Sequence, residues 1–145
     1  MRILGIIPAR MDSSRLPGKP MKKIHIIPMI GHCFKRSIQS KKLDKVYVAT
    51  PDKEIFEYIK SINGEAVMTS HKHKMCNDRV FEAVDKVEKI LKKKYDIIVN
   101  IQGDLPMIFP NMIDTLIEPI LENKNISNTT MAELIQNDKE FKDPN

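Results

Sequence analysis

The hydrophobic positions of this chain fall into short apolar runs that alternate with longer stretches of helical spacing. Residues Ile3–Ile7, Val46–Ala49 and Ile97–Ile101 are nearly uninterrupted apolar runs, which is typical of strands buried on both faces. A shorter run, Glu65–Met68, predicts one more strand. Because strands that alternate with helices are joined by crossovers, the pattern favours an open, mainly parallel sheet.

Two helices are predicted around the second apolar run. The first extends from Pro28 to Ser40, with Pro28 opening it, since proline is favoured in the first turn of a helix. The second follows Thr50 as the N-cap and Pro51 as the first helical residue, and Asn63-Gly64 ends it. Its buried face is expected to carry Ile55, Phe56, Ile59 and Ile62.

A longer amphipathic helix with Asn77 as its N-cap is the clearest element of the chain. Its apolar face carries Val80, Ala83, Val84, Val87, Ile90 and Leu91. Another helix, with Met112, Ile113, Leu116 and Ile117 on one side, is expected to kink or end at Pro119. A weak strand is predicted over residues 127–132. The predicted fold class is therefore α/β: a Rossmann-like, mainly parallel open sheet with helices on both faces, forming one domain over residues 1–145.

Composition agrees with a globular domain and excludes several classes of protein. The chain has 145 residues, 41% of them hydrophobic and 30% charged, which is enough for a packed core. No apolar run approaches the roughly 20 residues that span a bilayer, and Pro8 and Arg10 interrupt the first run too early for a signal peptide. We therefore expect a cytoplasmic protein without a membrane partner. Cys33 and Cys76 form no CxxC pair, so neither a disulfide framework nor a zinc site is predicted.

The net charge of +5 suits an anionic partner, but the excess is modest. The run Lys92–Lys94 follows an amphipathic helix, where lysines usually form a solvated end that complements the helix dipole. A basic nucleic-acid-associated protein is the weaker alternative, because no recognised motif or aromatic stacking pair accompanies these lysines. No nucleic-acid partner is predicted.

The loop after the first strand, Pro8–Pro20, contains the first candidate chemistry. Arg10, Arg15 and Lys19 lie within it, just beyond the carboxyl end of a buried strand, which is where ligands bind in open α/β sheets. Guanidinium and ammonium groups are the natural partners of phosphate oxygens. The segment is neither a Walker loop nor a GxGxxG fingerprint, so a basic surface loop remains an equal alternative.

The loop after the fourth strand, Asn100–Pro106, contains the second candidate. Asp104 follows Gly103 at the end of a buried strand, and a carboxylate there can hold Mg²⁺ together with phosphate oxygens and water. Taken alone, Gly103-Asp104 is better explained as a pair of residues favoured in turns.

A third segment, His71–Arg79, has poor spacing for a metal site. A cation in the first turn of a helix, as Arg79 is, opposes the helix dipole, so it points either to an anionic or polar partner or to an ion pair with Asp78 or Glu82.

Taken together, these loops resemble the cytidylyltransferases that make CMP-Kdo (Kdo is 3-deoxy-manno-octulosonate), with relatives that act on acylneuraminates. The resemblance is closest at Ile6–Pro20, where the chain reads IIPARMDSSRLPGKP, and at Asn100–Asp104, NIQGD. It continues in order through the segments Pro28–Ile30, Val48–Thr50, Met68–Ser70 and Asp78-Arg79. It implies the fold of nucleotide-diphospho-sugar transferases and a reaction in which a sugar hydroxyl attacks the α-phosphate of CTP and expels pyrophosphate.

The resemblance also implies roles for individual residues. The residues expected to contact the nucleotide or its metal are Ala9, Arg10, Arg15, Lys19, Arg79, Gln102 and Asp104. Arg15 and Lys19 would contact the phosphates, Arg79 the cytidine end, and Asp104 a Mg²⁺ ion. Arg15, Lys19 and Asp104 are the expected catalytic set. CTP, an acidic sugar such as Kdo, and a second copy in a homodimer are the implied partners.

Three departures from the family pattern bear on activity. Met75-Cys76-Asn77 stands where the family usually has Ser-Gly-Thr, and Leu105 stands where it usually has Glu. The chain ends at Asn145, short of the family's C-terminal part, which would supply most of the sugar site. The alternative to an active transferase is therefore a module that binds CTP or CMP without turnover.

Overall fold

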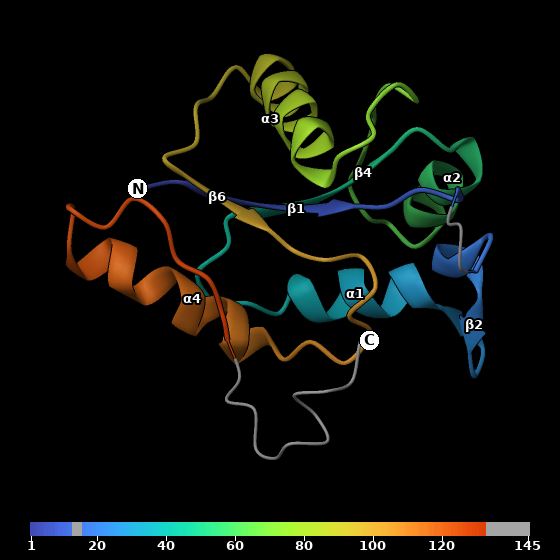
Figure 1. The fold of residues 1–145 in the computed structure, drawn as a ribbon, viewed down its shortest axis with the longest axis horizontal. Coiled ribbons are helices and arrows are strands. Elements are labelled where there is room, and N and C mark those ends of the chain that lie inside the picture. Colours follow the sequence, from blue (N-terminus) through green and yellow to red (C-terminus); the bar gives the residue numbers. More distant parts are fainter. Residues whose placement is uncertain (13–15, 133–145) are drawn as a thin grey trace.

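A four-stranded parallel sheet forms the centre of the molecule (Figure 1). The computed structural model describes residues 1–12 and 16–132. The strands of the sheet are β1 (Ile3–Pro8), β4 (Lys45–Thr50), β5 (Ala66–Met68) and β6 (Ile97–Asn100). Their order is β5-β4-β1-β6, and every neighbouring pair is parallel. The predicted parallel sheet is confirmed, and the carboxyl ends of its four strands lie at the same edge of the sheet.

Helices cover both faces of this sheet, as predicted (Figure 1). They are α1 (Met29–Ser37), α2 (Lys53–Ser61), α3 (Cys76–Leu91) and α4 (Pro110–Glu122). Helix α3 packs on one face, and α1, α2 and α4 pack on the other.

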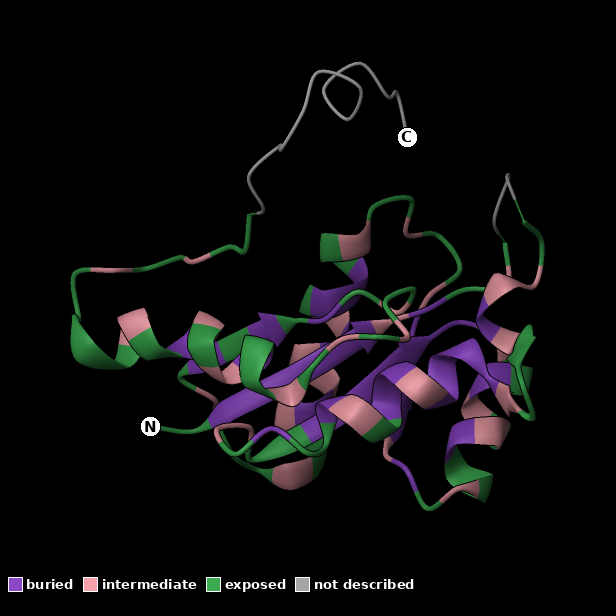
Figure 2. Ribbon diagram, turned by 90° about the horizontal axis from the view of Figure 1, so that it is seen from below, coloured by how far each residue is buried: buried purple, intermediate pink, exposed green. Residues whose placement is uncertain are grey.

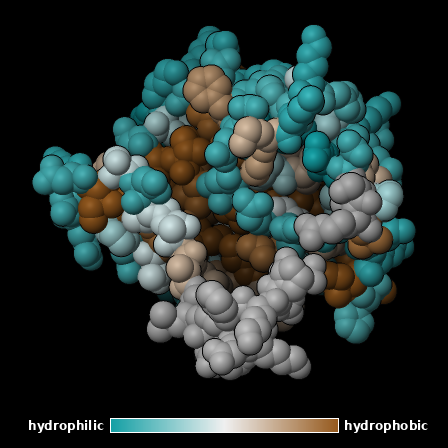
Figure 3. Space-filling model, in the orientation of Figure 1, coloured by the Kyte–Doolittle hydropathy of each residue, from teal (hydrophilic) through white to brown (hydrophobic). Residues whose placement is uncertain are grey.

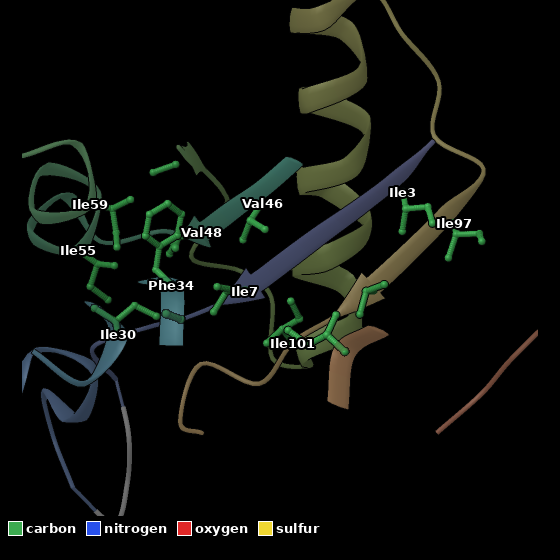
Figure 4. Close-up of a cluster of buried hydrophobic side chains, with 14 of the residues drawn as sticks. Ile3, Ile7, Ile30, Phe34, Val46, Val48, Ile55, Ile59, Ile97 and Ile101 are labelled. Carbon is green, nitrogen blue, oxygen red and sulfur yellow. The ribbon is translucent and has the colours of Figure 1, made fainter. Parts of the chain in front are cut away.

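The alternation of side chains along β1 explains the two layers of core. Ile3 and Ile7 point into the cluster shared with α1, α2 and α4 (Figure 4). Leu4 and Ile6 belong to the cluster shared with α3 on the other face. All four side chains are at most 4% exposed. Figure 2 shows the consequence, with buried residues concentrated in the strands and on the inner helix faces. A strand buried on both faces holds its two ends rigidly, which matters for the loops that leave it.

A small hairpin separates β1 from α1. It consists of β2 (Lys23–Ile24) and β3 (Ile27–Pro28) and follows the 3₁₀ turn η1 (Lys19–Met21). These elements were not predicted, because two-residue strands leave no usable hydrophobic period.

Three predicted helix starts are wrong by one to three residues. Pro28 belongs to β3 and is the N-cap of α1, which ends at Ser37 and not at Ser40. Helix α3 begins at Cys76 with Met75 as its N-cap, so Asn77 lies inside the first turn.

The start of α2 is the third correction. The helix begins at Lys53 after Asp52, because the Thr50 hydroxyl accepts the Asp52 N–H and so shapes the turn before the helix.

Of the two outcomes predicted at Pro119, a kink or an end, the structure excludes the end. Helix α4 continues past Pro119 to Glu122, and Ile120 packs against the core beyond the proline, so burial outweighs the lost backbone hydrogen bond. The strand predicted near the end of the described chain is wrong. Residues 127–132 form no strand; the Thr129 hydroxyl instead donates to the Leu116 carbonyl and ties the segment to α4. Within residues 1–12 and 16–132, no helix has the length and apolarity required to cross a membrane.

Candidate functional site

A cleft of about 630 Å³ opens at the carboxyl ends of β1 and β6. The loops after these two strands form its floor, and the segment before α3 forms one wall. Its lining includes Pro8, Ala9, Arg10, Asp12, Lys19, His73, Lys74, Met75, Cys76, Arg79, Gln102, Gly103 and Asp104. The two loops that the sequence singled out therefore face one cavity, as expected.

Lys19 and Asp104 meet in this cleft. The Lys19 Nζ lies 2.9 Å from the Asp104 Oδ2, although 85 positions separate the two residues in the chain. Their side chains are 36% and 51% exposed, so the pair contributes at most about 1 kcal/mol to stability. A pair this open to solvent can separate readily and offer each group to a ligand.

The backbone of the first loop is closed at its base. Gly18 has φ 70°, a left-handed conformation that glycine adopts without strain, and its N–H donates to the Met11 carbonyl at 2.9 Å. The turn η1 starts at the next residue, so the Lys19 side chain is directed by a fixed backbone.

The second loop is held against the first by a very close backbone approach. A Cβ atom added at Gly103 would lie 2.6 Å from the Pro8 carbonyl oxygen, so only glycine fits between the loops. The buried Cys33 thiol donates to the Gly103 carbonyl at 3.3 Å. Burial raises the pKa of this thiol to about 11, so it remains a protonated donor at neutral pH. These contacts fix the backbone of Gly103 and so position Asp104, the next residue.

Arg79 is a buried cation at the edge of the cleft. The residue is 4% exposed, and its Nη1 donates to the Thr69 hydroxyl at 2.6 Å and to the Ser70 carbonyl at 3.2 Å. Burial lowers the guanidinium pKa, and the charge of Arg10 lowers it further. These hydrogen bonds are to neutral oxygens, where the simplest expectation was an ion pair with Asp78 or Glu82. The Thr69 hydroxyl and the Ser70 carbonyl therefore hold the guanidinium of Arg79 at the wall of the cleft.

Glu82 anchors the loop that contains Thr69 and Ser70. Its Oε2 accepts the Ser70 N–H at 2.8 Å and contacts the His73 Nε2, while Lys86 pairs with its Oε1 at 2.7 Å. Burial raises the pKa of Glu82, but the hydrogen bonds from Lys86, the Ser70 amide and His73 outweigh it and hold the pKa at about 2. The role of His73 is thus to fix this loop to α3.

The remaining predicted residues are distributed as follows. Arg10, Ala9 and Gln102 line the cleft, and the Ala9 N–H is already used by the Ala49 carbonyl. Arg15 lies outside the described residues.

Two of the family departures, Met75 and Cys76, line this cleft, and Met75 is 66% exposed. Asn77 and Leu105 instead line a separate hollow between β6 and α4, and Leu105 is 48% exposed. Asn100, at the end of β6, donates through its Nδ2 to the Asn77 Oδ1 at 3.3 Å and lies near the Cys76 thiol. These contacts join β6 to the first turn of α3 and shape the wall between them.

A second, larger hollow of about 1230 Å³ runs between β6 and α4. Apolar side chains dominate its lining, among them Ile98, Met107, Phe109, Met112, Leu116 and Ile120. Figure 3 shows apolar surface gathered in a hollow on the face that carries β6 and α4. A surface of this kind is unsuited to a triphosphate, so the polar cleft is the candidate nucleotide site.

The lysine run after α3 has a structural explanation. Lys92 ends the helix with φ 52°, and Lys94 pairs with Glu88. These residues form the solvated helix end that was favoured over a nucleic-acid site.

From the sequence, Cys33 and Asp52 had no expected role in this geometry, and Glu82 was considered only as an ion-pair partner of Arg79. Asp52 accepts the Met11 N–H at 2.8 Å. The contacts of Cys33 and Asp52 join positions 70 and 41 apart in the chain, which only the fold of the sheet brings together.

The fold and the polar cleft define a nucleotidyltransferase-type α/β protein. Residues 4–145 match the family model described as cytidylyltransferase, and the chain belongs to that family. It is 42% identical over 142 residues to a 3-deoxy-manno-octulosonate cytidylyltransferase of Thermodesulfovibrio yellowstonii, covering 97% of this chain and 55% of that protein. The corresponding Fusobacterium nucleatum enzyme is also 42% identical, over 100% of this chain and 57% of its own length. The chain thus spans about half the length of the curated relatives it matches.

Solved structures give the same assignment. A CMP:2-keto-3-deoxy-manno-octonic acid synthetase complexed with CTP superimposes with a TM-score of 0.79 at 38% identity, over 86% of this chain and 49% of that one. A cytidylyltransferase from Leptospira borgpetersenii gives a TM-score of 0.68 at 28% identity, over 86% and 50% of the two chains. A 4-diphosphocytidyl-2C-methyl-D-erythritol synthase, at 12% identity, shares the fold alone.

Proposed function

We propose that this protein is a CTP-dependent sugar cytidylyltransferase that transfers CMP to an acidic sugar, Kdo, and releases pyrophosphate. The observation that carries the proposal is the meeting of Lys19 and Asp104, 2.9 Å apart, in a cleft also lined by Arg10 and Arg79. Cations from two elements face one cavity large enough for a nucleotide, which suits the charge of a triphosphate.

Each described residue has a proposed task. Lys19 and Arg10 bind the phosphates, together with Arg15 of the same loop. Arg79 holds the cytidine end, Ala9 forms part of the nucleotide wall, and Gln102 faces the nucleotide or the sugar. The sugar hydroxyl forms the new P–O bond at the α-phosphorus while the bond to the pyrophosphate oxygen breaks. The loop cations stabilise the negative charge that the leaving group gains.

The donor set of the cleft fits Mg²⁺. Asp104 presents a half-exposed carboxylate, and Asp12 lines the same cavity. Mg²⁺ takes one or two protein carboxylates and completes its octahedron with phosphate oxygens and water, so this sparse oxygen set is sufficient. We propose that Asp104 holds the ion, which when bound neutralises phosphate charge. Lys19 would then exchange its carboxylate partner for a phosphate oxygen.

The proposal extends to the setting of the enzyme. We propose that residues 1–145 form a nucleotide-binding domain that belongs to a longer family fold, that it acts in the cytoplasm in lipopolysaccharide biosynthesis, and that it works as a homodimer. Light scattering of the purified chain on a sizing column distinguishes a dimer from a monomer.

Calorimetric titration with CTP in MgCl₂, followed by a pyrophosphate-release assay with Kdo, tests the function. We expect saturable CTP binding and pyrophosphate release that depends on both substrates. Absence of CTP binding would refute the assignment.

A second candidate, a CTP- or CMP-binding module without turnover, is favoured by Met75 and Leu105, which stand where the family pattern has Ser and Glu. Binding without pyrophosphate release in the presence of Kdo or other acidic sugars would select it.

A further inference from the structure

Asp52 occupies an unusual position for a helix N-cap. It immediately precedes α2, where an aspartate normally accepts an amide hydrogen bond from the first turn of its own helix, but its carboxylate makes no such bond. Instead the Oδ2 accepts the Met11 N–H from the loop after β1, at 2.8 Å. The carboxylate therefore binds the loop after β1 and not its own helix.

The reason lies in how the sheet ends. The Ala9 N–H donates to the Ala49 carbonyl at 2.9 Å, which is the last ladder bond between β1 and β4. The next amide on that side belongs to Met11, but Pro51 and the turn into α2 carry the β4 backbone away from it. The Asp52 side chain supplies the acceptor that the strand no longer provides, so the Met11 amide beyond the end of β1 is still paired.

Met11 in turn fixes the other end of the loop. Its carbonyl accepts the Gly18 N–H at 2.9 Å, and Gly18 directly precedes Lys19. Met11 is thus held on its N–H side by Asp52 and on its carbonyl side by Gly18. Arg10 and Lys19, the two described cations of this loop, flank these two anchored points. Asp52 is not among the residues that line the cleft, so it acts behind its wall.

We infer that Asp52 is a positioning residue for the phosphate-binding loop, an inference that rests on the proposed CTP binding. Its carboxylate oxygen holds Met11, and through Met11 it sets the separation of Arg10 and Lys19. The charge of Asp52 also favours the protonated form of Arg79, whereas the charge of Arg10 opposes it and lowers the Arg79 pKa. The ligand that this loop would bind through Arg10 and Lys19 is a nucleoside triphosphate.

Three variants test this inference by calorimetric titration of Mg·CTP. Asp52→Ser places a residue type favoured at helix N-caps before α2, but its shorter side chain withdraws the acceptor from Met11. We expect its CTP dissociation constant to rise about tenfold, as is typical for loss of a hydrogen bond to a charged group. Asp52→Asn keeps an oxygen acceptor and is expected to bind within about threefold of the wild type.

Asp44→Ser is the matched control. The Asp44 Oδ2 accepts the Ile3 N–H at 2.6 Å, the same kind of contact at the opposite end of β1, away from the cleft. Its urea midpoint should fall as much as that of Asp52→Ser, while its CTP affinity stays at the wild-type value.

Asp52→Ser binding as tightly as the wild type, or Asp44→Ser losing as much affinity, would overturn the inference and leave the proposed function standing. Asp52→Asn binding as weakly as Asp52→Ser would overturn the acceptor role. A wild-type chain that binds no CTP would remove the proposed function and this inference with it.

Discussion

Replacing Gly103 with alanine should separate the two loops of the cleft. The added Cβ would lie 2.6 Å from the Pro8 carbonyl oxygen, whereas ordinary carbon–oxygen contacts begin at about 3.3 Å. The loops must therefore move apart by roughly 0.7 Å, because the obstacle is backbone and not the end of a flexible side chain. Overpacking of this kind costs about 1–3 kcal/mol of unfolding free energy.

The same shift should weaken nucleotide binding. Asp104 follows Gly103 directly, so a displacement of that size moves the proposed metal ligand relative to Lys19, whose Nζ lies 2.9 Å from it. We expect the CTP dissociation constant to rise about tenfold, which corresponds to ~1.4 kcal/mol. Urea unfolding and calorimetric titration of the same samples measure the two effects.

Gly64→Ala provides the control for overpacking alone. Its Cβ would lie 2.7 Å from Ile59 Cγ2 and 2.8 Å from the Phe34 ring, in the core and away from the cleft. It should lose stability to a similar degree and bind CTP normally. A Gly103→Ala chain with wild-type stability and wild-type CTP affinity would refute the close-approach reasoning.

Three further predictions concern charges near the cleft. Glu82→Gln should lower the unfolding free energy at pH 7 by about 1 kcal/mol, since a folded pKa of about 2 against an ordinary 4.5 stabilises the fold above pH 4.5 and solvent screens part of the interaction. That advantage is lost as the pH falls from 4.5 to 2, so urea curves of the two proteins should converge there; a constant difference would contradict the assignment. Lys19→Met should change stability by less than about 1 kcal/mol yet weaken CTP binding at least tenfold, and equal CTP affinity in titrations at matched salt would count against a phosphate role. Leu105→Glu adds a carboxylate next to Asp104 in the chain and should strengthen Mg²⁺-dependent CTP binding several-fold; a magnesium titration showing no change would show that a carboxylate at position 105 does not reach the ion.

Much of the layered architecture was predictable from hydrophobic spacing. Continuous apolar runs identified β1, β4 and β6, because strands covered on both faces by helices can carry few polar residues. Helix ends were less predictable: Pro28, Thr50 and Asn77 each resembled a start signal, but contacts from distant segments decided where α1, α2 and α3 begin.

The candidate site shows the same division. The sequence by itself determined that cations follow the first strand and that an aspartate follows the fourth, and parallel strands place such loops at one edge of the sheet. Only the tertiary structure decided that Lys19 reaches Asp104, that Gly103 lies against Pro8, and that Asp52 holds Met11. The physical reason is that the burial of a strand can be predicted from the apolar side chains of that strand alone. A contact between loops depends instead on the strand order, β5-β4-β1-β6, which brings together residues more than 40 positions apart.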